Sequence, residues 1–363
     1  MPIKKLDLYI GKKFVQTFFF VCLIFTLIAM SIDYINKVDK FIEHDLSASV
    51  ILSEYYINFI FWINMLLWPM FLLIAIIFFT SRMAYQSEII SILNAGVPFR
   101  RVLLTYLTVT GFLTLLHLFA NHHTLPLSNQ TRLNFENMYI YEQNDKGKTR
   151  DIQMYTSPDE KIYIRNYTKK DSTGRTFRLS RYDDLQLTYL LQAKKVSWIE
   201  EPNRWKIHDY TIHTFDGNDE TIEFGRGKTM DTIVNMHPSD FVRYINQKEM
   251  VTTLDMNNFI EREKNRGLGG SKTYIVERAR RTAESISMLL LCVLGVSIAS
   301  RKVRGGTGLH LALGISIGAA MILMSKFSVT FANGDNVPAT LGVWIPNIIF
   351  SIIAYITVSK AQK

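Results

Sequence analysis

Cysteine is scarce in this chain, and the sequence signature of a nucleotide-binding enzyme is missing. Only two cysteines occur among 363 residues, and both Cys22 and Cys292 lie inside apolar runs. The long polar region between those runs therefore has no disulfide and must be held together by its own core. Segment 269–273, Gly-Gly-Ser-Lys-Thr, superficially resembles a phosphate-binding loop, but Ser271 stands where that motif needs glycine. We expect no ATP-binding site there.

Metal-ligand and catalytic arrangements are also lacking. His117, His122 and His123 cluster at the end of one apolar run, but this spacing does not place them on one helical face. No H-E-x-x-H motif or neighbouring carboxylate accompanies them, so we interpret them as interfacial histidines rather than metal ligands. No apolar run carries paired acids or a Ser/His arrangement. The sequence predicts a non-catalytic protein with no catalytic residue, cofactor or metal site.

Long apolar runs are what the chain has instead. They cover residues 14–33, 57–80, 102–120, 283–300, 307–329 and 340–358. Each run, as a helix rising ~1.5 Å per residue, is long enough to cross the ~30 Å apolar core of a bilayer. A helix can cross because it satisfies its backbone polar groups internally. These runs exclude a purely soluble enzyme and predict a polytopic α-helical membrane protein with six transmembrane helices, three in each half of the chain.

The distribution of positive charge predicts the orientation of those helices. With six spans both termini lie on one side, and that side holds twelve cations but only two acids, Asp7 and Glu88. The cations are Lys4, Lys5, Lys12, Lys13, Arg82, Arg100, Arg101, Arg301, Lys302, Arg304, Lys360 and Lys363. Because basic residues near helix ends resist translocation, we expect both termini to be cytoplasmic. The net charge of +9 then reflects membrane topology, and we expect no nucleic-acid partner.

A polar region separates the third and fourth apolar runs and is long enough for one inserted domain. We therefore divide the chain into residues 1–120 with the first three helices, the inserted domain 121–282, and residues 283–363 with the last three helices. Short β-branched or aromatic runs separated by turn signals predict an antiparallel sandwich or partly open roll in the insert. Its inward side chains, among them Tyr163, Phe177, Leu187 and Trp198, either line an acyl groove or fill a core.

The loop after the second span reads as a short amphipathic helix over about residues 82–97, ended by Gly96 and Pro98. Two interpretations are open. Periodicity alone favours a helix that anchors at the membrane surface. The functional interpretation is a lever that docks into a soluble motor subunit, with Glu88 as the only acid of the short cytoplasmic loops.

Several short motifs, in their order along the chain, carry a resemblance to a known family. They are Leu-Asp-Leu-Tyr-Ile-Gly-Lys at 6–12, Ser87-Glu88 followed by Ala95-Gly96 and Arg100-Arg101, Gly-Ile-Ser-Ile-Gly at 314–318, and Trp-Ile-Pro-Asn at 344–347. The chain resembles the LptF/LptG (YjgP/YjgQ) permeases of lipopolysaccharide export. The similarity spans nearly the whole chain, and the first motif is closer to LptG. It implies a β-jellyroll-like fold for the inserted domain.

The resemblance also implies a function and a set of partners. Such a permease is the transmembrane part of an ATP-driven exporter in the inner membrane of Gram-negative bacteria. It extracts lipopolysaccharide and passes it to a periplasmic bridge toward the outer membrane. The implied partners are an LptB-like cytoplasmic ATPase dimer, a second, LptF-like permease and an LptC-like bridge protein. Glu88 matches the acid of the family's coupling helix and Gly96 its helix-ending glycine, so Glu88, Ser87, Gly96 and Arg100 become the candidate ATPase-coupling residues.

For the lipid substrate we expect cations near the outer ends of the spans, where they can bind lipid A phosphates. The candidates are Lys37, Lys40, Arg278, Arg280, Arg281 and Lys326. The alternative is that they form ordinary ion pairs with Asp33, Asp39, Glu43 or Glu277. Asp33 stands where family members often have a basic residue, and Ser285 where they often have proline. The first departure leaves open whether substrate preference is altered.

Small residues on the fifth span suggest close helix packing. Gly314 and Gly318 form a G-x-x-x-G pair, which permits close approach of two helix backbones. In the resembling family the first and fifth spans form lateral gates between the two permeases; packing within this chain is the alternative. Two other function classes remain open, a mechanotransmission or lipoprotein-release permease and a membrane-anchored periplasmic assembly or interaction protein.

Overall fold

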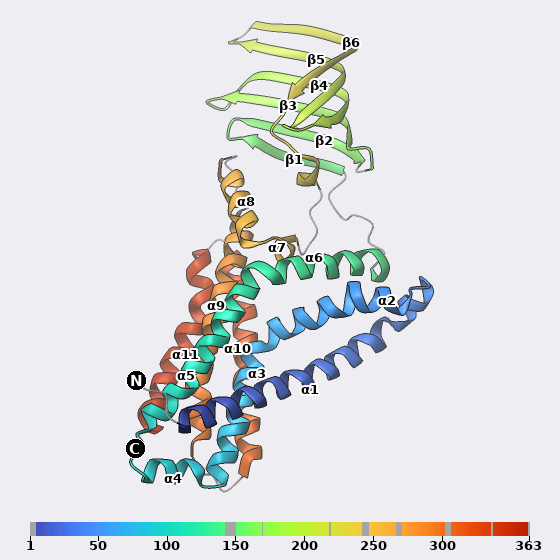
Figure 1. The fold of residues 1–363 in the computed structure, drawn as a ribbon. Coiled ribbons are helices and arrows are strands. Elements are labelled where there is room, and N and C mark those ends of the chain that lie inside the picture. The colour runs from blue at the N-terminus through green and yellow to red at the C-terminus, as the bar shows by residue number, and fades with distance from the viewer. Residues whose placement is uncertain are drawn as a thin grey trace. The chain divides into compact units, whose positions relative to one another are not determined.

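The computed structural model describes residues 5–141, 150–168, 170–217, 219–241, 247–265, 271–301, 306–334 and 337–361. The chain forms two compact units (Figure 1). The helical unit comprises Met1–Glu142, Glu249–Met256 and Lys272–Lys363, and the β unit comprises Gln143–Lys248 and Asn257–Ser271. The Gly-rich segment 267–270 lies outside the described residues.

Six helical segments of the helical unit are long and apolar enough to cross a membrane, which confirms the six predicted spans. Two of the six segments include additional short helices. In chain order the elements are α1 Lys5–Glu43; α2 Ala48–Val50, η1 Ile51–Tyr56 and α3 Ile57–Tyr85; α5 Phe99–Phe119, η2 Ala120–Thr124, α6 Leu125–Phe135 and η3 Glu136–Ile140; α9 Lys272–Ala299; α10 Gly306–Asn333; and α11 Ala339–Ala361. Several extend well beyond the apolar runs, because polar residues at their ends are held by ion pairs described below.

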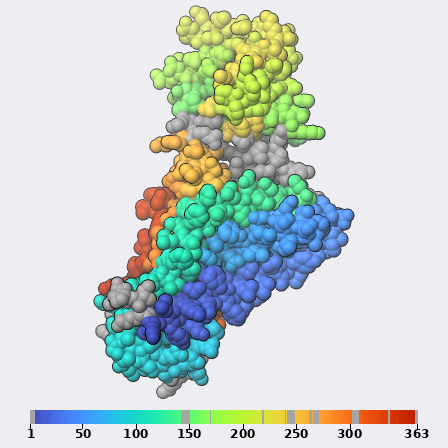
Figure 2. All heavy atoms as spheres, viewed as in Figure 1, coloured from blue at the N-terminus to red at the C-terminus, as the bar shows by residue number. Residues whose placement is uncertain are grey.

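Helix α9 lies at the centre of the helical unit and packs against α3, α5, α10 and α11. The main apolar core is formed by α1, α3, α5 and α9, with Phe14, Phe71 and Cys292 fully buried in it. Both cysteines are buried and free, as expected. Much of α1 remains on the surface of the helical unit, where Figure 2 shows it in blue. The core therefore leaves α1 less enclosed than α9.

The β unit contains one antiparallel sheet of six strands in sequential order, so neighbouring strands are joined as hairpins. The strands are β1 Arg150–Ser157, β2 Glu160–Thr168, β3 Thr173–Asp183, β4 Gln186–Glu200, β5 Arg204–Asp216 and β6 Asp219–Ile233. One face of the sheet packs into a core that includes Ile164, Phe177 and Trp205. Trp205 Nε1 donates to the carbonyl of Met236 at 3.0 Å, which fixes the segment after β6 onto that core. The antiparallel insert predicted from the sequence is confirmed.

The direction of individual strand side chains was only partly predicted. Phe177 is 1% exposed in the core, and Trp198 packs against that core. Tyr163 was expected to point inward but lies on the opposite face, because the neighbouring Ile162 and Ile164 are fully buried and successive strand side chains alternate. Leu187 is half-buried and lies outside the core cluster.

Three short helices follow the sheet. They are η4 Pro238–Phe241, α7 Gln247–Met250 and α8 Thr253–Asn265. Helix α8 covers the stretch 254–264 that the sequence indicated as helical. Its first residues belong to the helical unit, which includes Glu249–Met256. The chain thus returns to the helical unit before the apolar part of α9 begins.

Candidate coupling and lipid-contact sites

The loop after α3 forms helix α4, Glu88–Asn94, between two left-handed turns (Figure 1). It is shorter than the expected 82–97, because α3 continues to Tyr85 and Ser87, with φ 61°, breaks the helix. Gly96 ends α4 with φ +81°, and a Cβ there would meet no atom within 4 Å. The glycine is therefore required by its backbone conformation rather than by space. Pro98 then precedes the first residue of α5.

Helix α4 has apolar side chains on two faces. Ile89 is 2% exposed and packs into the main apolar core. Ile90 and Leu93 are 38% and 37% exposed. A helix whose second face carries exposed aliphatic side chains is well suited to cover by another protein.

Glu88 borders a polar cavity of about 680 Å³ between the start of α1 and the end of α3. Lys13 and Arg82 are the cations of its lining, and Glu88 is its only acid. Within the described residues the Glu88 carboxylate forms no ion pair with either cation. Arg100 is exposed in the first turn of α5 and also forms no ion pair among the described residues. Both charges at this end of the protein are available to a partner.

The same end of the helical unit is tied together by Asp7, for which no structural contact was predicted from the sequence. Asp7 of α1 accepts from Arg101 Nη2 at 3.0 Å and from Thr105 Oγ1 at 2.9 Å, both on α5. Gly11 lies where a Cβ would be 3.3 Å from Val109 of α5. These contacts fix the start of α1 to the helix that follows α4.

At the other end of α1, Lys37 lies in a buried network with a balanced charge. Its Nζ is 2.8 Å from both Asp33 Oδ1 and Glu136 Oε1, and it also bonds the Tyr55 hydroxyl. Tyr55 donates to Asp33 at 2.9 Å, and Arg132 Nη1 is 3.0 Å from Glu136. Two cations and two acids thus join α1, η1, α6 and η3. Asp33 supplies the partner of Lys37 that one of the two sequence interpretations named.

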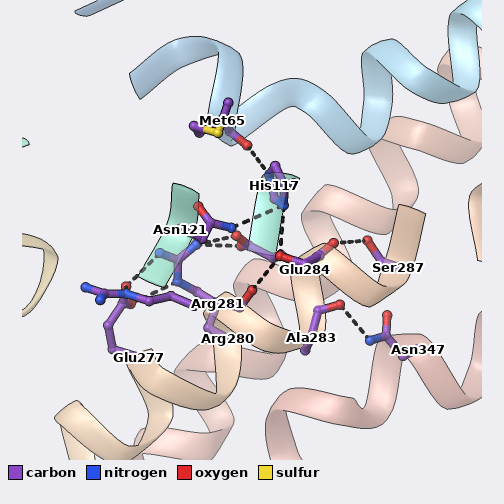
Figure 3. Close-up of polar contacts among 11 residues, drawn as sticks. Met65, His117, Asn121, Glu277, Arg280, Arg281, Ala283, Glu284, Ser287 and Asn347 are labelled. Carbon is purple, nitrogen blue, oxygen red and sulfur yellow. Dashed lines mark hydrogen bonds and ion pairs between the residues drawn. The ribbon is translucent and has the colours of Figure 1, made fainter. Parts of the chain in front are cut away.

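A second buried network lies on α9 (Figure 3). Arg280 forms bonds to Glu277 at 2.7 Å and to Glu284 at 2.6 Å. Arg281 Nε bonds Glu277 at 3.2 Å, and its Nη2 donates to the carbonyl of Val251 at 3.0 Å. Glu277 and Arg281 are only 3% and 2% exposed. Arg281 therefore holds the returning segment of the chain onto α9.

The histidines at the end of α5 extend this network. His117 is fully buried, with Nε2 2.9 Å from the Met65 carbonyl and Nδ1 2.9 Å from Ser285 Oγ. The interfacial interpretation of His117 stays a prediction, and within the protein its ring is enclosed between α3 and α9. His122 bonds Thr253 Oγ1 at 2.8 Å. Among the described residues no group of three or more His, Cys, Asp or Glu could hold a metal ion.

The two glycines of α10 pack against α3. A Cβ on Gly314 would lie 2.5 Å from Ile77 Cδ1, and one on Gly318 would lie 3.0 Å from Met70 Cγ. A side chain at position 314 would therefore displace the end of the Ile77 side chain, so Gly314 favours close contact of α10 with α3. Lys326 of the same helix is exposed and forms no ion pair among the described residues.

Comparison with known families assigns the chain. It matches the family described as lipopolysaccharide export system permease LptF/LptG over residues 8–360. The chain belongs to the LptF/LptG family. No curated protein sequence matches it significantly. The family and the six apolar helices establish a multi-pass inner-membrane protein with a permease role in lipopolysaccharide transport.

The structure of this LptF/LptG-family chain does not bring the expected substrate cations into one ring. Lys37 and Arg281 lie in separate networks, in which Glu136 pairs with Lys37 and Glu277 pairs with Arg281. Lys40 pairs with Glu43 at 2.8 Å on the surface. Lys326 alone of these four forms no ion pair within the described residues. No local pattern in the sequence indicates Glu136, which contacts Lys37 from 99 positions away.

Proposed function

We propose that this LptF/LptG-family chain is the transmembrane half of an ATP-driven exporter. It extracts lipopolysaccharide from the inner membrane and passes it to a periplasmic bridge toward the outer membrane. Both termini and α4 lie in the cytoplasm, and the β unit lies in the periplasm. An LptB-like ATPase dimer hydrolyses ATP, a second, LptF-like permease completes the lipid path, and an LptC-like protein receives the lipid.

The observation that carries this proposal is the construction of α4. Two residues, Gln86 and Ser87, separate it from α3, and a glycine turn with Pro98 joins it to α5. Ile89 fixes one side of α4 in the core, while Glu88, Ile90 and the end of α4 remain accessible. A partner that moves α4 therefore moves α3 and α5 with it, which is how a rigid connector converts domain closure into helix rotation.

Glu88 is the charged contact in this proposal. It lies in the first turn of α4, forms no ion pair among the described residues, and can meet a cation of the ATPase. A charge-assisted contact of this kind adds orientation to the apolar contact of Ile90 and Leu93. Ser87 and Gly96 set the angle of the helix, and Arg100 flanks it.

The lipid path follows from the helices that this chain leaves most exposed. In the apolar windows of α1 and α10 only 22% of residues are buried. Exposed apolar side chains on them are Phe19, Phe20, Leu23, Ile24, Leu27 and Ile28 of α1, and Leu309, Leu313, Ile315, Leu323, Phe327 and Phe331 of α10. In the proposal the second permease meets these faces, and the acyl chains enter between them. Lys326, exposed on α10, contacts a lipid A phosphate. The Lys37 and Arg281 networks keep the helices beside the lipid path in place.

The proposal is tested with Glu88→Lys. We expect the ATPase still to co-purify, because the apolar contacts of α4 remain, while ATP-dependent release of lipopolysaccharide from proteoliposomes falls by at least about tenfold. The matched control is Glu54→Lys, which makes the same charge change at an exposed residue of η1. Normal release by Glu88→Lys, or an equal loss with Glu54→Lys, would refute the coupling role.

A further inference from the structure

The outer face of the β sheet, opposite its apolar core, has a hollow of about 600 Å³ across β1, β2 and β3. Its volume lies in the ~300–1,000 Å³ range of small-molecule sites. Residues of all three strands line it, and ten residues contribute. The hollow is formed entirely within the β unit.

Strand register places the lining side chains in rows. Gln153 pairs with Tyr163, and Tyr163 pairs with Arg178, across the three strands. In the next row Lys161 pairs with Ser180. Because Ile162 and Phe177 between these positions point into the core, the polar members of each strand all point to the hollow.

The charge in this hollow is predominantly positive. Lys161, Arg165 and Arg178 line it, and none of them forms an ion pair within the described residues. Asp151 is the only acid of the lining. Its Oδ1 accepts a hydrogen bond from the Tyr163 hydroxyl at 2.7 Å rather than from a cation.

Some other cations of the same sheet have carboxylate partners. Arg181 pairs with Glu160 at 2.7 Å, and Arg204 pairs with Asp231 at 3.4 Å. Acids are thus available on the sheet but do not neutralise the hollow. Three cations that form no ion pair, against the single acid Asp151, give the hollow an excess of positive charge that suits an anion.

The backbone beside the hollow is strained on both sides of Arg165. Asp151 has φ 48° and Thr176 has φ 56°, a region that residues other than glycine rarely adopt and that is a clear outlier for a β-branched residue. The register pairs Arg150 with Asn166 and Asn166 with Arg175, so both strained residues flank the same point of β2. Strain of this kind persists where the surrounding structure enforces it, and it clusters at binding sites.

We propose that this hollow binds an anionic saccharide, a sugar that carries a phosphate or carboxylate group. The guanidinium and ammonium groups receive the anion in charge-assisted bonds. Gln153, Tyr163 and Ser180 present the amide and hydroxyl groups that bond sugar hydroxyls. The site does not depend on the proposed export function and lies on the face of the sheet opposite the apolar core.

The test uses the full chain in nanodiscs and saturation-transfer NMR with glucose 6-phosphate. We expect saturable binding that weakens with added salt and little response with glucose. Lys161→Gln combined with Arg178→Gln should weaken binding by at least about tenfold, which corresponds to ~1.4 kcal/mol. The control pair is Arg226→Gln with Lys228→Gln, which removes the same two charges from β6 outside the hollow.

Equal responses to glucose and glucose 6-phosphate would overturn the proposal, and so would equal weakening by the control pair. A photoreactive residue at position 180 in cells distinguishes the sources of the ligand. Capture of lipopolysaccharide assigns the saccharide of the exported lipid to the hollow, and capture of a lipid-free phosphosugar assigns a soluble ligand. Capture of protein alone, without sugar, would contradict the site. Absence of sugar binding alongside uncoupling by Glu88→Lys would refute this inference and leave the export function standing.

Discussion

Helices α9 and α10 are neighbours in sequence, have 28 residues each, and have apolar stretches of nearly equal hydropathy. Their surroundings differ sharply, since 61% of the α9 window is buried but only 22% of the α10 window. Hydropathy therefore identifies a span without indicating its role. The role follows from the side chains that each helix brings to its neighbours.

The difference lies in how each helix is attached. Helix α9 carries Glu277, Arg280 and Arg281, whose charges are neutralised inside the helical unit. Buried charges are tolerated in a membrane protein only with such partners. Helix α10 instead uses Gly314 and Gly318 to approach α3, a contact based on shape. We infer that α9 is the scaffold of the unit and that α10 is a peripheral helix.

The largest effect is expected from Glu277→Gln on α9. The change leaves Arg281 buried without a carboxylate and Arg280 with Glu284 alone. Breaking a buried ion pair by removing one partner costs about 3–5 kcal/mol, so the melting temperature of the purified chain should fall strongly. The exposed control Glu54→Gln should change stability by less than ~0.5 kcal/mol. Equal melting temperatures for both variants would remove the scaffold role of α9.

A smaller effect is expected from Gly314→Val on α10. The new side chain would overlap Ile77, whose Cδ1 lies 2.5 Å from the position of the first added carbon. Overpacking of this kind costs about 1–3 kcal/mol, and Ile77→Ala in the same chain should restore part of the loss. Gly308→Ala, at a site with no atom within 4 Å, is the control in thermal unfolding. A fully stable Gly314→Val variant would show that α10 does not depend on this contact.

The smallest effect on stability is expected from Lys326→Gln. The side chain is exposed and has no ion pair among the described residues, so unfolding should change by less than ~0.5 kcal/mol. Under the proposed function, however, photo-crosslinking of lipopolysaccharide to α10 should fall several-fold. Lys5→Gln, also exposed, controls for the loss of one positive charge. Unaltered crosslinking would exclude Lys326 from the lipid path.

The sequence predicted spans well and their ends poorly. Apolar runs of about twenty residues indicate membrane helices directly, but α1 extends from Lys5 to Glu43 beyond its apolar run. Its outer end is stabilised by Lys37 and Glu136, a pairing that no local pattern reveals. Helix α4 was expected, but its start depends on the left-handed Ser87, and periodicity carries no sign of that conformation.

The candidate site was predicted less completely than the fold. Glu88 and Gly96 were singled out from the loop sequence and assigned to coupling by family resemblance, and their positions at the two ends of α4 agree with a coupling role that stays a prediction. The cations of the proposed lipid path were chosen by location, and location could not show which of them already had acids beside them. In the β unit, the alternation of inward and outward side chains was assigned one residue out of step, which placed Tyr163 in the core instead of the hollow.

Arg281 forms a hydrogen bond to Val251, and His122 forms one with Thr253. These contacts have a practical consequence for building chimeras. A chimera that exchanges residues 121–282, the region between the third and fourth apolar runs, would also exchange Val251 and Thr253. Junctions near Gln143 and Lys248 would leave Glu249–Met256 with its host helices. The junctions of such a chimera are thus set by these hydrogen bonds rather than by the ends of the apolar runs.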